Sequence, residues 1–285
     1  MAAIKKNVFS LFPMVVRRLY QLVRRYPIIV APFIGVAVFE GLVLAVWFLA
    51  PRPPLSMALA PIIRAFWGEQ FLHYPTNFLL LPKIFEYSRN VLTFITGILF
   101  SGIALSMLLQ ASQGQQPEWF LGIGRVARRY FRLVIIWGVV FGLSAACGKA
   151  LSHYAGFFPS LRWFLAAEFA ATVAVQLLFV FAFPAIVIEN RKTFMSLIRS
   201  LALVRLYPLT SFLIVFIPSL FVLPVIYVQL HLPALMRTVA PEAALWALCL
   251  RIVLVTVVDC AVTLAAGMLL IIHRENEQSP QGEPK

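Results

Sequence analysis

Long apolar stretches separated by short polar connections dominate the pattern of this chain. Six of them, residues 28–50, 90–112, 133–157, 163–188, 209–231 and 244–273, are each more than 20 residues long. About 20 mostly apolar residues suffice for a helix to cross a hydrocarbon core of roughly 30 Å. The segments of roughly ten residues with alternating polarity that mark transmembrane barrels do not occur in the sequence. The pattern therefore predicts an all-α polytopic membrane protein with six transmembrane helices.

A basic phrase precedes the first, third and fifth of these stretches. Residues 22–27 read LVRRYP, residues 203–208 read LVRLYP, and residues 125–132 read RVARRYFR. Each phrase closes a segment in which apolar residues recur at helical spacing, as in helices that lie in the plane of a membrane interface. This repetition predicts three units, about 8–112, 117–188 and 193–273, each a basic amphipathic helix followed by a helical hairpin. The alternative is a chance likeness, because membrane interfaces favour these residue types.

The predicted faces of the basic helices differ in their chemistry. In the first helix, Arg17, Arg18, Gln21, Arg24 and Arg25 lie opposite an apolar stripe that ends at Tyr26. The third helix has two predicted faces. The apolar face is formed by Phe194, Leu197, Ile198, Leu201 and Val204. The polar face is formed by Ser196, Arg199, Ser200 and Arg205. We expect the polar faces to be turned toward water and anionic headgroups.

Charge and composition place the protein in a membrane and suggest its orientation. Hydrophobic residues make up 61% of the chain, charged residues 12%, and the mean hydropathy is +0.90. The net charge of +13 comes largely from Lys and Arg in the N-terminal arm, before the third and fifth spans and in the tail. Because basic residues beside spans are retained in the cytoplasm, we expect both termini to be cytoplasmic, in a bacterial inner (plasma) membrane, and no nucleic-acid partner. Residues 1–273 form one membrane domain in this prediction, and residues 274–285 a disordered tail.

The arginines of the basic helices are the candidate binding residues. Near an anionic surface each such residue contributes about 1 kcal/mol of attraction. The other interpretation is that they only set the topology. The candidates for contact with anionic lipid headgroups or a protein partner are Arg17, Arg18, Arg24, Arg25, Arg125, Arg128, Arg129, Arg199 and Arg205.

Charged residues within the apolar stretches are the second group of candidates, because a charge at the centre of a span costs about 2.5 to 3.5 kcal/mol on insertion scales. They are Glu40, Lys149, Glu168, Arg251 and Asp259. Counting the helical rise along the spans, we expect Lys149 or Arg251 to pair with Glu168, and Glu40 and Asp259 to face the bundle interior. These carboxylates define the alternative function, a transporter of a small solute or ion. The other interpretation is a set of structural hydrogen bonds between helices.

Two further features concern packing and the predicted outer surface. Six prolines between residues 51 and 89 exclude one continuous span there and predict an external amphipathic loop. Within it, the apolar residues between 62 and 71 predict a short helix at the outer surface. Small residues at four-residue spacing predict a tight hairpin between the third and fourth spans, with contact between two copies of the chain as the alternative. These ladders are Gly138, Gly142, Ala146 and Ala150, and Ala166, Ala170 and Ala174.

No catalytic or metal-binding pattern occurs in the chain. HExxH, GxSxG and Walker-type motifs are missing, and Cys147, Cys249 and Cys260 have no zinc-site spacing. We therefore expect no enzymatic activity, no cofactor and no metal.

One segment resembles a known group of proteins. Between residues 183 and 212, Pro184 precedes a helix end, Glu189 follows it, and Arg199-Ser200 lies on the next amphipathic helix. This segment resembles six-helix bacterial membrane proteins of unknown function and is similar to the membrane domain fused to some glycerophosphodiester phosphodiesterases. Because the 285 residues hold no phosphodiesterase catalytic domain, the resemblance implies no such activity here. We expect Glu189 to pair with a basic helix and fix a corner of the fold.

These observations lead to one function hypothesis and one alternative. The first is a non-catalytic scaffold, or a membrane protein that contacts lipids or a partner through its basic helices. The alternative is the small-solute or ion transporter.

Overall fold

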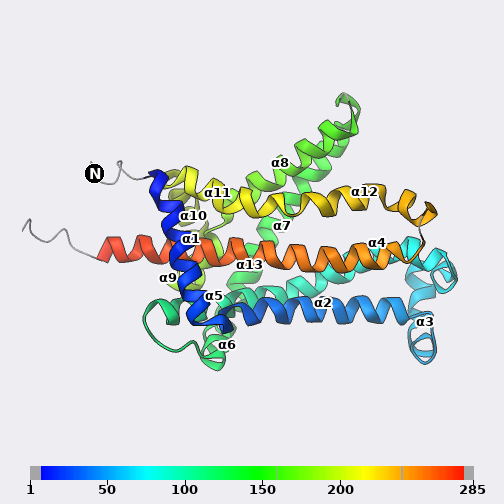
Figure 1. Cartoon of the computed structure of the whole chain (residues 1–285), viewed down its shortest axis with the longest axis horizontal. Helices are drawn as coiled ribbons and strands as arrows, with labels where there is room; N and C mark the ends of the chain where they lie inside the picture. Colours follow the sequence, from blue (N-terminus) through cyan, green and yellow to red (C-terminus); the bar gives the residue numbers. More distant parts are fainter. Residues whose placement is uncertain (1–7, 159, 239, 279–285) are drawn as a thin grey trace, which may run out of the picture. The chain divides into compact units, whose positions relative to one another are not determined.

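The computed structural model describes residues 8–158, 160–238 and 240–278, and within these ranges every regular element is helical (Figure 1). Six helical segments are long and apolar enough to cross a membrane, which confirms the prediction of a multi-pass membrane protein. They are Pro27–Leu49, Thr76–Ser112, Tyr130–His153, Leu161–Glu189, Pro208–Leu232 and Ala243–Gln278.

These segments are built from shorter elements. In chain order the elements are α1 (Val8–Arg25), η2 (Pro27–Val30), α2 (Ala31–Leu49), α3 (Leu55–Trp67), η3 (Glu69–Leu72), α4 (Thr76–Leu92), the π-helical turn η4 (Thr93–Gly97), α5 (Ile98–Ser112), α6 (Trp119–Ala127), α7 (Tyr130–His153), η5 (Ala155–Phe157), α8 (Leu161–Phe179), α9 (Ala182–Glu189), α10 (Thr193–Leu206), α11 (Pro208–Leu220), α12 (Leu223–Thr238) and α13 (Ala243–Gln278).

The second span begins much earlier than the sequence predicts. The expected start was residue 90, after an external loop covering residues 51–89, but helix begins at Thr76 and continues through η4 into α5. Pro82 lies inside α4 and does not end the helix. The prediction gave this proline too much weight, since prolines are tolerated in membrane helices. The rest of the predicted loop contains α3 and η3, and α3 confirms the short helix that the sequence predicts there.

The chain forms two compact units, each from segments far apart in the sequence. Unit 1 combines the chain up to Pro32 with Ile98–Ser219 and the chain from Cys260 onward. Unit 2 combines Phe33–Gly97 with Leu220–Asp259. The division does not follow the three consecutive units that the basic phrases predict.

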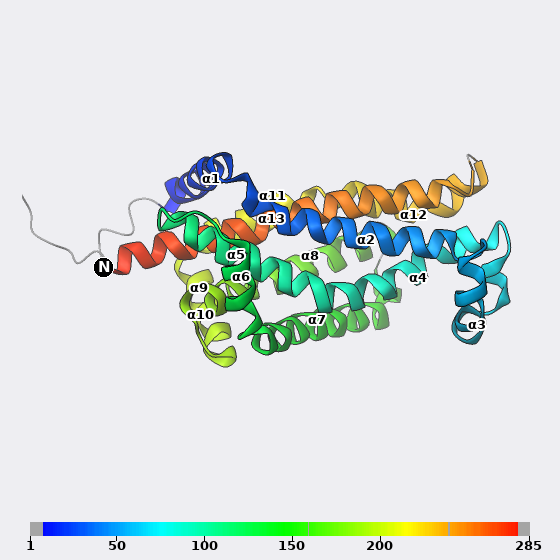
Figure 2. The same ribbon diagram turned by 90° about the horizontal axis from the view of Figure 1, so that it is seen from below.

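The centre of unit 1 is α5, on which every residue from 102 to 111 is buried. It contacts α1, α6, α7 and α9, and Figure 2 shows α6 running beside it. Gly267 of α13 permits a further close approach, because a Cβ atom there would lie 2.6 Å from Leu105 Cδ2. Small residues on α13 and α6 thus pack the unit around one buried helix.

A break in the fourth span shapes the same unit. Helix α8 ends at Phe179 and α9 begins at Ala182, with Pro184 in the first turn of α9, where its missing N–H is tolerated. Ser200 of α10 bridges this break, since its Oγ donates to the Leu178 carbonyl at 2.8 Å and accepts from the Phe181 N–H at 3.2 Å. One buried hydroxyl therefore satisfies two backbone groups that the break leaves without helical partners.

The two ladders of small residues do not form the predicted tight hairpin. All seven residues of the ladders on α7 and α8 are exposed. A Cβ atom at Gly138 or Gly142 would meet nothing within 4 Å. Helices α7 and α8 do contact each other, and the buried residues of α8 are Val173 and Val175, which belong to neither ladder. The prediction was wrong because small residues allow close approach without specifying which surface uses it.

Unit 2 has its own apolar core. Leu44 of α2, Ile63 of α3 and Phe85 of α4 meet Leu248 and Ile252 of α13, and Trp47 packs edge-on against Phe71. A smaller cluster joins α2, α4, α12 and α13 through Phe48, Phe78, Leu232, Met236 and Ala244. Both cores consist of helix faces that pack against each other, as in water-soluble helical proteins.

Candidate functional site

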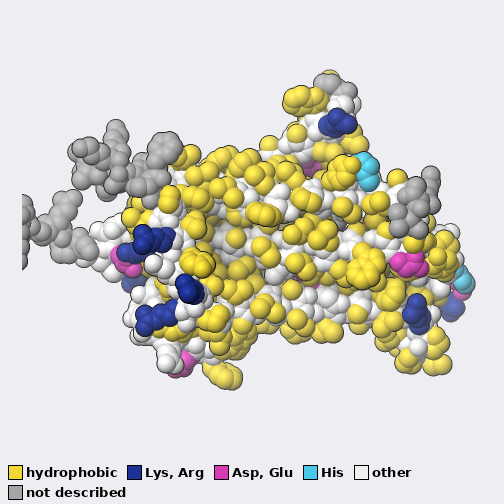
Figure 3. Space-filling view, viewed as in Figure 1, with side chains coloured by type: hydrophobic (Ala, Val, Ile, Leu, Met, Phe, Trp, Pro, Cys, Tyr) yellow, Lys and Arg dark blue, Asp and Glu magenta, His cyan; other side chains and the backbone are white. Residues whose placement is uncertain are grey.

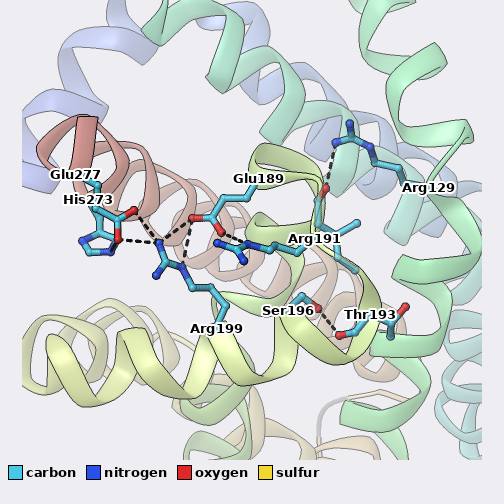
Figure 4. A network of polar contacts seen from close by, with 9 residues as sticks. Arg129, Glu189, Arg191, Thr193, Ser196, Arg199, His273 and Glu277 are labelled. Atoms are coloured by element: carbon cyan, nitrogen blue, oxygen red, sulfur yellow. Dashed lines mark hydrogen bonds and ion pairs between the residues drawn. The ribbon is translucent and has the colours of Figure 1, made fainter. Parts of the chain in front are cut away.

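A network of charged side chains closes one end of unit 1. We call it the corner network, and it comprises Glu189, Arg191, Arg199, Tyr207, His273 and Glu277 (Figure 4). Helix α9 ends at Glu189, and Asn190 takes a left-handed conformation with φ 56°, which turns the chain toward α10. Asparagine is among the few residues that adopt this conformation readily. The turn places Glu189 facing the side chains of α10.

Arg199 is the centre of the corner network. Its Nη2 lies 3.1 Å from Glu189 Oε1 and 3.0 Å from Glu277 Oε2, so it links α9 and α13 through α10. The carboxylate of Glu189 also accepts from Arg191 Nε at 3.1 Å. The prediction that Glu189 pairs with the basic helix is confirmed. Figure 4 shows the carboxylates of Glu189 and Glu277 on either side of the Arg199 guanidinium, with Arg191 bonded to Glu189.

The far side of the corner network is an aromatic and imidazole pair. His273 Nε2 lies 3.0 Å from Glu277 Oε1, and its Nδ1 lies 3.0 Å from the Tyr207 hydroxyl. Burial, together with the nearby charge of Glu277, raises the pKa of the Tyr207 hydroxyl above its ordinary value. Tyr207 is therefore a neutral hydrogen-bonding group at physiological pH, and it fixes the orientation of the His273 ring.

Burial makes these contacts consequential for the fold. The Glu189 side chain is 8% exposed and that of Arg199 is 20% exposed. Burial disfavours the Arg199 charge, but the hydrogen bonds and the attraction from Glu189 and Glu277 outweigh it and raise the pKa of the guanidinium. The ion pairs of Arg199 thus hold its charge in place at every relevant pH.

A second arginine stabilises the same helix end. Arg129 Nη1 donates to the carbonyl oxygens of Ile186 at 3.0 Å and Val187 at 2.6 Å. The last four carbonyls of a helix lack partners within it, so Arg129 satisfies two of them at the end of α9. Burial and repulsion from Arg125, Arg132 and Arg128 lower the pKa of Arg129. Arg125 in turn donates to the buried Ser106 of α5 at 3.2 Å.

The nine candidate arginines therefore divide into two groups. Arg125, Arg129 and Arg199 bond to groups inside unit 1, and Arg18 pairs with Glu275 at 2.7 Å. The other five are exposed and have no carboxylate partner among the described residues. This exposed group comprises Arg17, Arg24, Arg25, Arg128 and Arg205. The sequence pattern did not separate the two groups, because both occupy the same helices.

The third basic helix turns part of its predicted polar face toward the protein, while Arg205 of that face is exposed as predicted. On α10, the buried residues include Ser196 and Ser200 of the predicted polar face, and Arg199 of that face is half-buried. Phe194 of the predicted apolar face is 71% exposed. The prediction was wrong because the hydroxyls and the guanidinium find acceptors within the protein, which leaves the apolar face for another environment.

Unit 2 contains a chain of ion pairs inside its spans. We call it the span network, and it comprises Glu40, Glu86, Arg89 and Arg251. Arg89 Nε lies 3.1 Å from Glu40 Oε1, whose side chain is 5% exposed. Glu86 pairs with Arg251 and lies 4.0 Å from Arg89. Two carboxylates and two guanidiniums thus balance their charges among α2, α4 and α13.

Sequence reasoning identified half of the span network. Glu40 faces the interior as predicted, but Arg89 and Glu86 were assigned to the external loop. Their spacing of three residues, which puts both on one face of a helix, was the available signal. Arg251 pairs with Glu86, and the predicted pairing with Glu168 does not occur among the ion pairs of the described residues.

The other charged candidates of the spans lie on the protein surface. Lys149, Glu168 and Asp259 are exposed. Neither Lys149 nor Glu168 has an ion pair within the described ranges, although both belong to unit 1. Asp259 nevertheless lies close enough to Glu40 and Arg89 for their charges to act on it, so its predicted place facing the bundle interior stays a prediction.

Comparisons with known proteins return no relatives. No protein-family model, curated protein or solved structure matches the chain. Within residues 8–158, 160–238 and 240–278, no group of three or more His, Cys, Asp or Glu side chains could hold a metal ion. The candidate sites are thus the corner network, the span network and the exposed arginines.

Proposed function

We propose that this chain is a non-catalytic integral membrane protein whose three basic helices lie at one membrane surface and retain anionic lipids around a helical scaffold. In this proposal both termini are cytoplasmic, and each basic helix leads into a hairpin of two spans in a bacterial inner membrane. The resemblance of residues 183–212 to six-helix bacterial membrane proteins fits this role.

The main support for the proposal is the pairing of exposed cations with exposed apolar side chains. On each basic segment an exposed arginine stands beside an exposed large apolar side chain: Arg17 beside Val16, Arg128 near Phe131, and Arg205 beside Leu206. A helix at a membrane interface needs this combination, since its apolar side chains enter the acyl region and its cations contact headgroups. The outward apolar face of α10 has the same explanation.

The span network supports a scaffold over a transporter. A transport site requires carboxylates that reach a water-filled cavity in at least one state. Glu40 is instead buried and bonded to Arg89, and Glu86 pairs with Arg251 and lies within ion-pair distance of Arg89. Such closed pairing is what we expect of groups that hold helices together.

Neutralising the exposed arginines should change the lipids that travel with the protein. We expect the variant Arg17→Gln/Arg24→Gln/Arg128→Gln/Arg205→Gln, extracted in copolymer nanodiscs, to lose at least half of the enrichment of phosphatidylglycerol over the bulk membrane. The reason is the loss of about 1 kcal/mol of attraction per residue. The measurement is the lipid composition of the purified discs.

A control of equal charge makes the result specific. The variant Arg52→Gln/Arg64→Gln/Lys83→Gln/Arg162→Gln neutralises four exposed basic residues outside the basic helices. We expect it to retain the enrichment of the wild-type protein. The proposal would be refuted if both variants lost phosphatidylglycerol enrichment equally, or if neither variant lost it.

A further inference from the structure

A groove in unit 1 lies between α1 and the ends of α5 and α13. Its volume is about 440 Å³, within the range of small-molecule sites. Figure 3 shows Lys and Arg side chains gathered around α1, near an acidic side chain at the end of α13. The groove is lined by Arg18, Gln21, Leu22, Arg25, Tyr26, Ala111, Ser112, Gly114, Met268 and Glu275.

Helix α1 divides its arginines between the groove and the outside. Arg18, Gln21, Leu22 and Arg25 follow the spacing i, i+3, i+4 and i+7, which places them on one helix face, and all four line the groove. Arg17 and Arg24 are seven residues apart on a different face, and neither lines it. Of the adjacent arginines in the basic phrase, Arg25 therefore lines the groove and Arg24 lies on the outer surface of the helix.

The groove offers one cation that the protein leaves uncompensated. Arg18 pairs with Glu275 at 2.7 Å, so these two charges cancel. The Arg25 guanidinium lies 5.4 Å from the centre of the Tyr26 ring, a cation–π contact that orients it, and has no carboxylate partner among the described residues. A planar guanidinium held in one orientation suits a phosphate group, which it can bind through two parallel hydrogen bonds.

The remaining lining residues suit the rest of a phospholipid. Leu22 gives the groove an apolar surface, with the nearly buried Ala111 and Met268 behind it, which inorganic phosphate would not use. The Gln21 amide, together with the Glu275 carboxylate, can bond to hydroxyl groups of a headgroup. One net positive charge matches the single negative charge of a phosphodiester.

From these features we infer that the groove binds one anionic glycerophospholipid, with the phosphodiester on Arg25, the headgroup hydroxyls toward Gln21 and Glu275, and the first part of the acyl chains along Leu22. This inference rests on the proposed function, because it assumes that α1 lies at a membrane surface. It adds a single defined site to the diffuse attraction of the exposed arginines.

The neighbouring residues Arg24 and Arg25 provide a matched test. The full-length protein, delipidated in a mild detergent, is titrated with short-chain phosphatidylglycerol, and one-to-one binding is measured by native mass spectrometry. We expect Arg25→Gln to bind about tenfold more weakly than Arg24→Gln, because both variants lose one charge of the same helix but only Arg25→Gln loses a charge-assisted hydrogen-bonding pair in the groove. Phosphatidylcholine of the same chain length and inorganic phosphate should both compete poorly.

The outcomes separate the groove from the wider proposal. Equal weakening by Arg24→Gln and Arg25→Gln would overturn the groove site while leaving the attraction of the basic helices intact. Competition by inorganic phosphate as effective as that of the lipid would overturn the lipid assignment. Lipid binding by Arg25→Gln that equals wild-type binding would overturn the groove site. The wider proposal would still stand if the four-arginine variant of the nanodisc experiment lost its phosphatidylglycerol enrichment.

Discussion

Replacing Arg89 by methionine is expected to lower the free energy of unfolding by about 3 to 5 kcal/mol, the largest effect of any single substitution considered for this protein. The substitution leaves Glu40, whose side chain is 5% exposed, without the guanidinium 3.1 Å away. An uncompensated carboxylate inside a span must be protonated or must pull water inward, and both cost free energy. Unfolding by SDS titration from a mild detergent measures the loss.

Two further variants test whether the loss of the Arg89–Glu40 ion pair causes the expected loss of stability. Arg64→Met removes the partner of Glu69 in an exposed pair at 3.2 Å, so we expect a loss of about 0 to 1 kcal/mol. The double variant Arg89→Met/Glu40→Met removes both charges, and we expect it to recover most of the stability. If Arg89→Met cost no more than Arg64→Met, or if the double variant were as unstable as the single one, the span network would not have the structural role assigned to it.

Replacing Arg199 by alanine is expected to cost about 2 to 3 kcal/mol. The value is lower than for Arg89 because water reaches part of the corner network and screens its charges. Glu189 would keep only its contact with the exposed Arg191, and Glu277 would keep only His273. The same SDS titration measures the effect, and Arg205→Ala on the same helix, an exposed site, should change stability by no more than about 0.5 kcal/mol.

The contribution of each of the two acids in the corner network to stability should follow how deeply its side chain is buried. Glu189 is nearly buried and bonds two arginines, whereas the side chain of Glu277 is half exposed. We therefore expect Glu189→Gln to destabilise the protein more than Glu277→Gln does. The opposite order would show that α13, and not the turn after α9, depends on Arg199.

Apolar periodicity and length were enough to predict the helices. The first span was expected at 28–50 and is Pro27–Leu49, and the basic helices expected before the third and fifth spans are α6 and α10. These elements depend on local properties, namely hydrophobicity over about 20 residues and helical spacing. The start of the second span was missed because the six prolines between residues 51 and 89, Pro82 among them, were interpreted as excluding a continuous span there.

The hydrophobic pattern did not predict which side chains of a helix point into the protein and which point outward. Arg24 and Arg25 are neighbours with the same chemistry, yet only Arg25 lines the groove. On α10 the inward face is polar because Glu189, Leu178 and Phe181 supply acceptors and donors from other segments. Those partners come from tertiary packing, which the hydrophobic pattern of one helix does not contain. The motif of Glu189, Arg199 and Ser200 nevertheless drew attention to residues that form one corner.

The proposed function requires the three basic helices to lie at one membrane surface. Single cysteines at positions 17, 128 and 205, in a variant lacking Cys147, Cys249 and Cys260, can be exposed to a charged thiol reagent in right-side-out and in inverted membrane vesicles. All three should react in inverted vesicles and remain unlabelled in right-side-out ones, because their surface is predicted to be cytoplasmic. Labelling of any one of them from the opposite side to the others would contradict the arrangement.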